Sequence, residues 1–168
     1  MAEVITQRMN ADKVGKNLWV GGLPTDPGAV SENFDALVLA ARDHQEIFPV
    51  HKYPKTRLIL APLDDDPYST KGMSAEQQAL ALRAALDVHK LNSQGKTVLV
   101  TCAAGVNRSA LIAGLAMVIS GDSAQQAIDR IRKHRKPPTG SIPLFNPHFR
   151  KMLRDVEQEL KKTDSPTR

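Results

Sequence analysis

The feature that most constrains this chain is a strand-like run that passes through a loop of small residues into an apolar helix. Residues 97–101 (TVLVT) predict a buried strand, because β-branched and large aliphatic residues follow one another. Residues 102–107 (CAAGVN) interrupt the run, and residues 110–119 predict an apolar helix. A loop that enters a helix N-terminus turns several backbone N–H groups inward, where the helix dipole adds partial positive charge. This arrangement favours the binding of a phosphate group.

Two side chains of this segment suit phosphate chemistry. Arg108 follows the loop, where its planar guanidinium can donate to two phosphate oxygens at once. Cys102 opens the loop, and the same N–H groups, the dipole and Arg108 favour its thiolate over its thiol. A thiolate in contact with a bound phosphate is a nucleophile aimed at phosphorus, and Ser109 can donate a hydrogen bond to it. The alternative interpretation is an inert buried cysteine at a strand end.

The rest of the chain predicts an α/β domain. Further strands are expected at residues 17–20, 36–40 and 57–60, with Trp19 in the core. Helices are expected to begin at two capping-box pairs and at an Asn-Pro step, and these start signals are Ser74 with Gln77, Ser123 with Gln126, and Asn146 with Pro147. On the first of these helices Leu82 and Leu86 follow on one face, and Gly95 lies beyond its expected end.

The expected organisation is a single domain with a central, mainly parallel sheet of four or five strands flanked by helices. Residues 1–15 are expected to be irregular, residues 16–161 to form the domain, and residues 162–168 to be a polar tail. A chain of 168 residues is long enough to bury its own core. We expect a monomer.

Composition excludes several classes. With one cysteine there is neither a disulfide scaffold nor a zinc site built on cysteines. No run of about 18 apolar residues predicts a membrane helix, and the N-terminus does not resemble a secretory signal, so we expect a cytoplasmic protein without a membrane partner. The net charge of +5 indicates an anionic partner. No metal or cofactor is expected.

Cys102, followed by Arg108 and Ser109, resembles the C-x5-R-S/T signature of the cysteine-dependent protein tyrosine phosphatase superfamily, and AAGVNRSA resembles its dual-specificity branch. The resemblance extends over about residues 17–160 and includes LWVGGL at 18–23 and NPHF at 146–149. It implies a dual-specificity phosphatase fold and hydrolysis of phosphotyrosine, phosphoserine and phosphothreonine through a phosphocysteine intermediate. Cys102, Arg108 and Ser109 would be catalytic. The implied phosphate-binding residues are Ala103, Ala104, Gly105, Val106, Asn107 and Arg108.

Expulsion of an alkoxide or phenoxide also requires a proton donor. Members of the superfamily take it from an aspartate on a loop after an upstream strand, and residues 61–67 (APLDDDP) follow the strand predicted at 57–60. When Pro62 and Leu63 are matched to the proline and aliphatic residue of the family loop, the acid corresponds to Asp65. A shift of this match by one residue would assign the acid to Asp64 or Asp66 instead. A solvated acidic turn is the alternative.

One residue departs from the family pattern. Thr101 precedes the cysteine where the family usually has a histidine that helps to hold the thiolate. The expected partner is a phosphorylated protein or another phosphomonoester. An RNA 5′-triphosphatase acting on an RNA 5′ end, a weakly catalytic phosphate-binding module and a rhodanese-like sulfurtransferase remain alternatives. The basic run at residues 132–136 either steers an anionic substrate or ends a helix.

Overall fold

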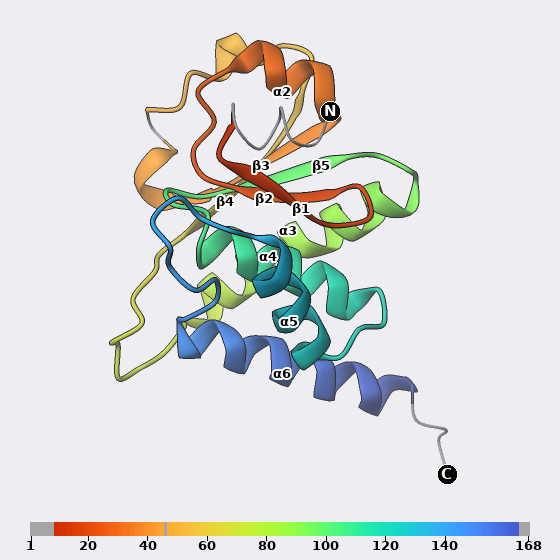
Figure 1. The fold of residues 1–168 in the computed structure, drawn as a ribbon. Coiled ribbons are helices and arrows are strands. Elements are labelled where there is room, and N and C mark those ends of the chain that lie inside the picture. The colour runs from red at the N-terminus through yellow and green to blue at the C-terminus, as the bar shows by residue number, and fades with distance from the viewer. Residues whose placement is uncertain (1–8, 46, 165–168) are drawn as a thin grey trace.

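The fold is built on a five-stranded sheet with the order β1-β2-β5-β3-β4 (Figure 1). The computed structural model describes residues 9–45 and 47–164. β1 pairs with β2 antiparallel, and the other neighbours are parallel, as the predicted α/β class requires. The strands are β1 (Ala11–Gly15), β2 (Leu18–Gly21), β3 (Ala36–Ala41), β4 (Arg57–Leu63) and β5 (Val98–Thr101).

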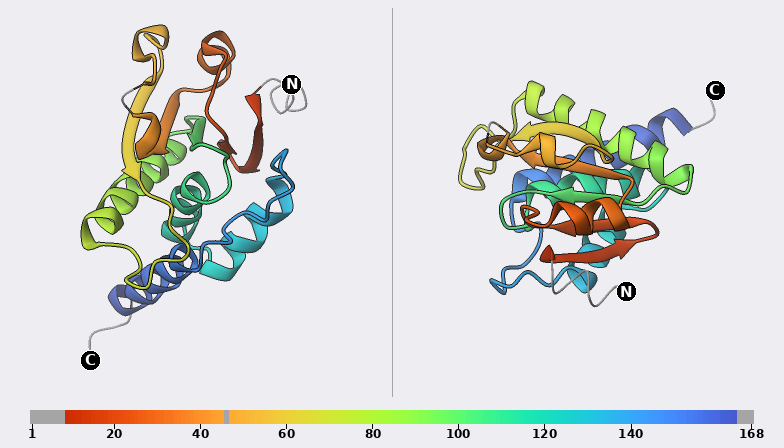
Figure 2. Two further views of the ribbon diagram at one scale, coloured as in Figure 1. Left: turned by 90° about the vertical axis from the view of Figure 1, so that its left-hand side faces the viewer. Right: turned by 90° about the horizontal axis from the view of Figure 1, so that it is seen from above.

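Helices cover both faces of this sheet (Figures 1 and 2). The helix α2 lies on one face, and four longer helices pack on the other, with α4 in contact with α3, α5 and α6. The helices are α2 (Pro27–Asn33), α3 (Ala75–Ser93), α4 (Arg108–Ile119), α5 (Ala124–His134) and α6 (Pro147–Asp164). Two short 3-10 turns, η1 (Arg42–His44) and η2 (Val50–Lys52), lie between β3 and β4.

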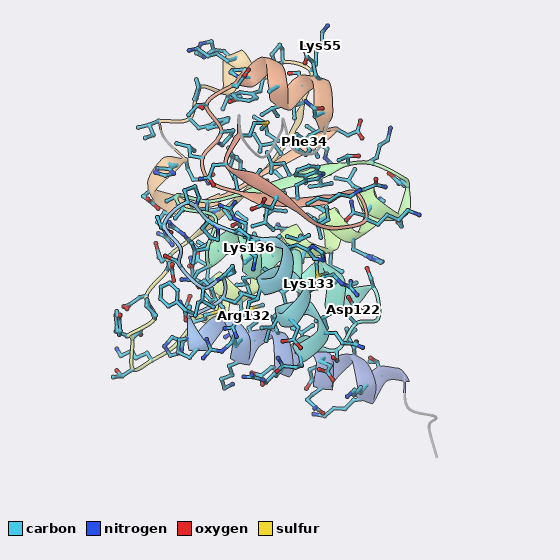
Figure 3. The ribbon with its side chains drawn as sticks, in the orientation of Figure 1. Phe34, Lys55, Asp122, Arg132, Lys133 and Lys136 are labelled. Carbon is cyan, nitrogen blue, oxygen red and sulfur yellow. The ribbon has the colours of Figure 1, made fainter. Side chains whose placement is uncertain are left out.

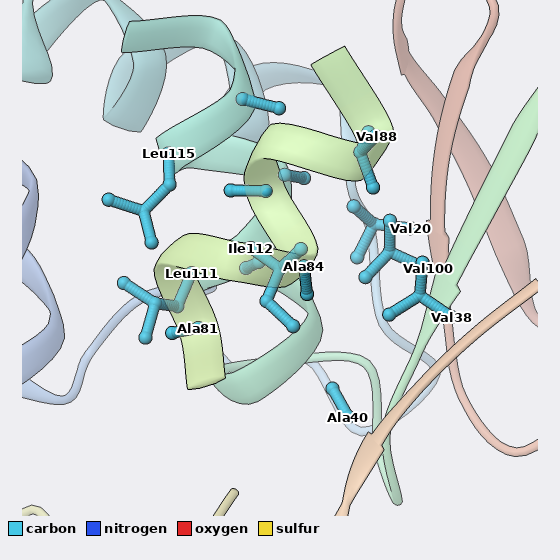
Figure 4. Packing of buried hydrophobic residues seen from close by; sticks show 14 of the residues in the cluster. Val20, Val38, Ala40, Ala81, Ala84, Val88, Val100, Leu111, Ile112 and Leu115 are labelled. Atoms are coloured by element: carbon cyan, nitrogen blue, oxygen red, sulfur yellow. The ribbon is translucent and has the colours of Figure 1, made fainter. Parts of the chain in front are cut away.

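The core forms because the central strands are apolar on both sides. Val38 and Val100 face the four-helix layer, whereas Leu37 and Leu99 face α2. Figure 4 shows the first pair beside Val20, opposite the side chains of α3 and α4. Alternation along a strand directs successive side chains to opposite faces, so these runs without polar residues indicate strands buried on both sides.

The three predicted helix starts are confirmed, although only one of the two expected capping boxes is complete. Ser123 and Gln126 form that box, and Asn146 caps α6 through a hydrogen bond from the His148 N–H to its Oδ1 of 2.9 Å. On α3, Leu86 is 49% exposed and Leu82 is partly buried against the core. Most of the buried side chains of α3 are small: Ala81, Ala84, Ala85 and Val88.

The ends of the chain also differ from expectation. Residues 11–15 form β1, although residues 1–15 were expected to be irregular, and α6 continues to Asp164, beyond the predicted start of the polar tail. Only Ala11 and Val14 of the β1 sequence ADKVG are buried, which is too few to produce an alternating pattern. The remaining parts of those two predictions, residues 1–8 and 165–168, lie outside the described residues. Within the described part, no helix is long and apolar enough to cross a membrane.

Candidate active site

The predicted site residues meet at the carboxyl ends of the parallel strands. The loop of residues 102–107 follows β5, Asp43 follows β3, and Asp65 follows β4. Because the carboxyl ends of parallel strands lie at the same edge of a sheet, segments that are distant in the chain come together there.

Cys102 lies at the base of this loop. Its side chain is buried, with the residue 4% exposed, and its backbone N–H donates to the carbonyl of Gly21 at 3.2 Å. Its Sγ lies 3.2 Å from the Oγ of Ser109, which is fully buried in the first turn of α4. The Ser109 hydroxyl is therefore placed to donate to a thiolate at Cys102.

The loop directs its carbonyls outward. Arg135 donates from Nη2 to the carbonyl of Ala104 at 3.0 Å and from Nε to that of Gly105 at 2.9 Å. The N–H of Leu144 donates to the carbonyl of Val106 at 2.9 Å. In a planar trans peptide the C=O and N–H groups point in opposite directions. The N–H groups of residues 105–107 therefore turn to the other side of the loop, where an anion can accept from them.

Arg108 lies at this edge with part of its guanidinium unused. Its Nη1 donates to Asp43 Oδ1 at 2.5 Å and to the carbonyl of Leu63 at 3.1 Å. Its Nε is buried and has no hydrogen-bond partner among the described residues. The hydrogen bond from Arg108 holds the pKa of Asp43 below its usual range. Asp43 thus fixes one arm of the guanidinium and leaves buried donor capacity for an oxyanion.

Asp65 is tied to the loop by two buried asparagines. Its Oδ2 accepts from Asn107 Nδ2 at 3.0 Å, and its Oδ1 accepts from Asn146 Nδ2 at 2.8 Å. The N–H of Asn146 in turn donates to Asn107 Oδ1 at 3.1 Å. The Asn107 side chain makes no capping bond to α4, because it is engaged in this network. The network holds the Asp65 carboxyl group beside the loop of residues 102–107.

The neighbouring carboxylates point elsewhere. Asp64 pairs with Arg42 at 3.1 Å, and Asp66 accepts from the N–H of Tyr68 within its own turn at 3.1 Å. Gln77 steadies this acidic loop, since its side chain donates to the carbonyl of Pro62 at 3.2 Å and accepts from the N–H of Asp64 at 2.8 Å. Gln77 therefore does not complete the expected capping box with Ser74.

The Thr101 hydroxyl does not support the cysteine. It donates across the sheet to the carbonyl of Val38 at 2.8 Å and is 1% exposed. A hydroxyl with one proton has no second proton to donate to the loop. The contribution of the family histidine therefore has no counterpart at this position.

The residues of the basic run at 132–136 have different roles: two lysines are exposed, and two arginines bind backbone carbonyls. Lys133 and Lys136 are exposed, whereas Arg135 is buried against the loop and cannot meet a substrate. Arg132 donates to the carbonyls of Pro143 and Leu144, and so supports the segment that leads to Asn146. Figure 3 labels the two lysines and Arg132 on and just beyond α5.

A cavity of about 260 Å³ lies beside the acidic loop. The polar side chains in its lining include Asp64, Asp66, Ser69, Asn146 and His148. No group of three or more His, Cys, Asp or Glu side chains able to hold a metal ion occurs within residues 9–45 and 47–164.

Sequence reasoning missed three members of this site. Asp43 stands alone after a strand, without a flanking pattern. Arg135 is one of several adjacent cations, and the sequence does not show which of them turns inward. Asn146 was predicted as a helix cap, but its hydrogen bond to Asp65 carried no sequence signal.

The fold was compared with known proteins. No protein-family model and no curated protein matches the sequence. Among solved structures, Tk-PTP in its active form aligns with a TM-score of 0.71 at 21% identity, over 89% of this chain and 97% of that chain. Human DUSP28 aligns with a TM-score of 0.68 at 19% identity, over 90% and 95%. PTPMT1 in complex with PI(5)P aligns with a TM-score of 0.72 at 17% identity, over 93% and 99%.

These alignments span nearly the whole length of both partners. The chain therefore has the fold of the dual-specificity and cysteine-dependent tyrosine phosphatases, and the resemblance seen in its sequence is confirmed at the level of the fold.

Proposed function

We propose that this protein is a cysteine-dependent phosphatase that hydrolyses phosphomonoesters of tyrosine, serine and threonine through a phosphocysteine intermediate. The observation that carries the proposal is the hydrogen bond between Asn107 and Asp65, which brings a carboxyl group to the loop that holds Cys102. Nucleophile, anion-binding amides and proton donor thereby share one edge of the sheet.

In the first step the Cys102 thiolate attacks phosphorus in line. An S–P bond forms while the P–O bond to the leaving group breaks, and Asp65 gives its proton to the departing oxygen. The N–H groups of the loop and the free part of the Arg108 guanidinium stabilise the equatorial oxygens. This positive field meets the need that a metal ion serves in other phosphatases, so we expect no metal requirement.

In the second step water attacks the phosphocysteine. Asp65, now ionised, accepts a proton from the water, an O–P bond forms, and the S–P bond breaks to release phosphate and the thiolate. The Ser109 hydroxyl, 3.2 Å from Sγ, stabilises the departing sulfur.

A phosphorylated protein segment is the substrate class we favour. Residues 103–107 (AAGVN) carry no cationic side chain for a second phosphate group. One structural neighbour was solved with PI(5)P, so a phosphoinositide belongs in the substrate panel. An RNA 5′-triphosphate end belongs there too. The position of Asp65 beside the loop favours a phosphomonoester, because a poor leaving group needs a proton donor.

A phosphate-binding module with little turnover is the second candidate. It is favoured by the hydrogen bond from the Thr101 hydroxyl to the carbonyl of Val38. Because of this bond, Thr101 does not donate a hydrogen bond to a thiolate at Cys102. We rank it below the enzyme, because the proximity of Cys102, Arg108 and Asp65 at one edge of the sheet supports turnover.

The decisive experiment measures hydrolysis of a phosphotyrosine peptide in the presence of a chelator across mildly acidic to neutral pH. We expect no turnover by Cys102→Ser and a loss of about 10²–10⁴-fold for Asp65→Asn, because general acid catalysis contributes that much. Asp66→Asn is the matched control, since it removes the neighbouring carboxylate and should retain activity.

Two results would contradict the proposal. A wild-type protein that binds tungstate without turnover would point to the binding module. Equal losses for Asp65→Asn and Asp66→Asn would show that Asp65 has no special role as the acid.

A further inference from the structure

The fully buried side chain with the largest volume in the described structure belongs to a charged residue behind the phosphate-binding loop. Arg135 follows α5 and is 1% exposed. Burial of a guanidinium is costly unless its N–H groups are paired. Here four hydrogen bonds satisfy it, and its partners are Ala104, Gly105, Asp12 and Asn10.

Two of these bonds act on the loop itself. They hold the consecutive carbonyls of Ala104 and Gly105, while the Gly105 backbone has φ +68°. A Cβ at Gly105 would lie 2.5 Å from Arg135 Nη2, so the guanidinium fits directly against the loop. A carbonyl held outward fixes the opposite direction of the next N–H group. Arg135 therefore sets the orientation of two amides that face the anion.

The other two bonds fix the guanidinium from behind. Asp12 Oδ2 accepts from Nη1 at 3.0 Å, and Asn10 Oδ1 accepts from Nη2 at 2.9 Å. β1, which carries Asp12, packs beside α5 (Figure 1). The ion pair with Asp12 partly offsets the guanidinium charge. What the contacts of Arg135 with the loop fix directly is the geometry of the loop amides.

We infer that Arg135 is a positioning residue that holds the phosphate-binding loop in its anion-accepting conformation. The inference rests on the proposed function only in that it concerns the same site. It predicts that the planar fork is required and that a single cation does not replace it, because one ammonium nitrogen cannot reproduce four hydrogen bonds spread over Nε, Nη1 and Nη2.

The test compares tungstate binding by the wild-type protein and by Arg135→Lys, measured by calorimetry at a temperature where both are folded. We expect Arg135→Lys to bind tungstate about 10- to 100-fold more weakly, since small misplacement of preorganised groups costs this much. The kcat/KM for an aryl phosphate should fall by the same factor. If Arg135→Lys does not fold, Arg135→Gln, which keeps one donor group, takes its place with the same expectation.

One control separates positioning from general stability. Ile131→Val creates a small core cavity on the same helix and lowers the unfolding temperature without touching the loop. It should bind tungstate as the wild type does.

The possible outcomes are distinct. Wild-type affinity in Arg135→Lys, or an equal loss in Ile131→Val, would overturn the inference, as would a wild-type protein that binds no tungstate. Tungstate binding without any hydrolysis would contradict the proposed function alone, and the comparison of affinities would still decide the role of Arg135.

Discussion

Asn146 performs two tasks with one side chain, and two substitutions separate them. Its Oδ1 accepts the His148 N–H and caps α6, while its Nδ2 donates to Asp65 Oδ1. Asn146→Ala removes both bonds. Asn146→Ser keeps a good capping oxygen and removes the donor to Asp65.

The sizes of the two effects follow from the structure. Loss of the cap costs about 1 kcal/mol of stability in the alanine variant only. Loss of the donor costs little stability in either variant, because Asp65 is exposed and water can replace the amide. In the proposed mechanism the same donor positions the acid. Asp65 is protonated and neutral when it acts as the acid, and a hydrogen bond between neutral groups contributes up to about 1.5 kcal/mol, which corresponds to about tenfold in rate.

The assay measures kcat/KM on a phosphotyrosine peptide together with thermal unfolding. We expect both variants to lose about tenfold in kcat/KM, and Asn146→Ala alone to lose about 1 kcal/mol by the loss of the cap. Wild-type turnover by Asn146→Ser would refute the role of Asn146 in positioning the acid. A turnover loss confined to Asn146→Ala would assign the effect to the helix cap.

Two further substitutions test the loop and its arginine. Gly105→Ala should abolish tungstate binding and destabilise the fold by about 1–3 kcal/mol, because its Cβ would lie 2.5 Å from the Gly21 carbonyl carbon in a left-handed backbone; normal binding by the folded variant would contradict this. Asp43→Asn should flatten the acid limb of the stability curve. The pKa of Asp43 is lowered in the folded state, so its contribution is present at neutral pH and is lost as the pH falls below about 4; it should stay under about 1 kcal/mol, since the side chain is 57% exposed. Identical unfolding curves of the two proteins in urea from neutral to acid pH would refute it.

The sequence predicts what local patterns determine. The apolar runs of β3 and β5 predict strands, and the apolar segment of α4 predicts a helix after a loop of small residues. The sequence of β1 does not predict a strand, because it is short and buries only two apolar side chains. The position of β1 in the sheet depends on its contacts with β2 and α5.

Within the site the same division holds. Cys102, Arg108 and Ser109 follow from one contiguous segment, and Asp65 from a short match after a strand. Arg135 depends on Asp12, 123 positions away in the chain, and no local pattern records such a pairing. Asp43 likewise acquires its role only when Arg108, 65 residues later, folds against it.

The bonds of Arg135 also determine when the site can exist during folding. They join residues 123 and 125 positions apart, so they close some of the longest loops in the chain, and long-range contacts form late because loop closure costs entropy. A chain that ends after α4 would carry the proposed nucleophile and Arg108 but would lack Arg135, which orients the loop amides in our proposal. We therefore expect phosphate binding to require a chain that extends at least through Arg135.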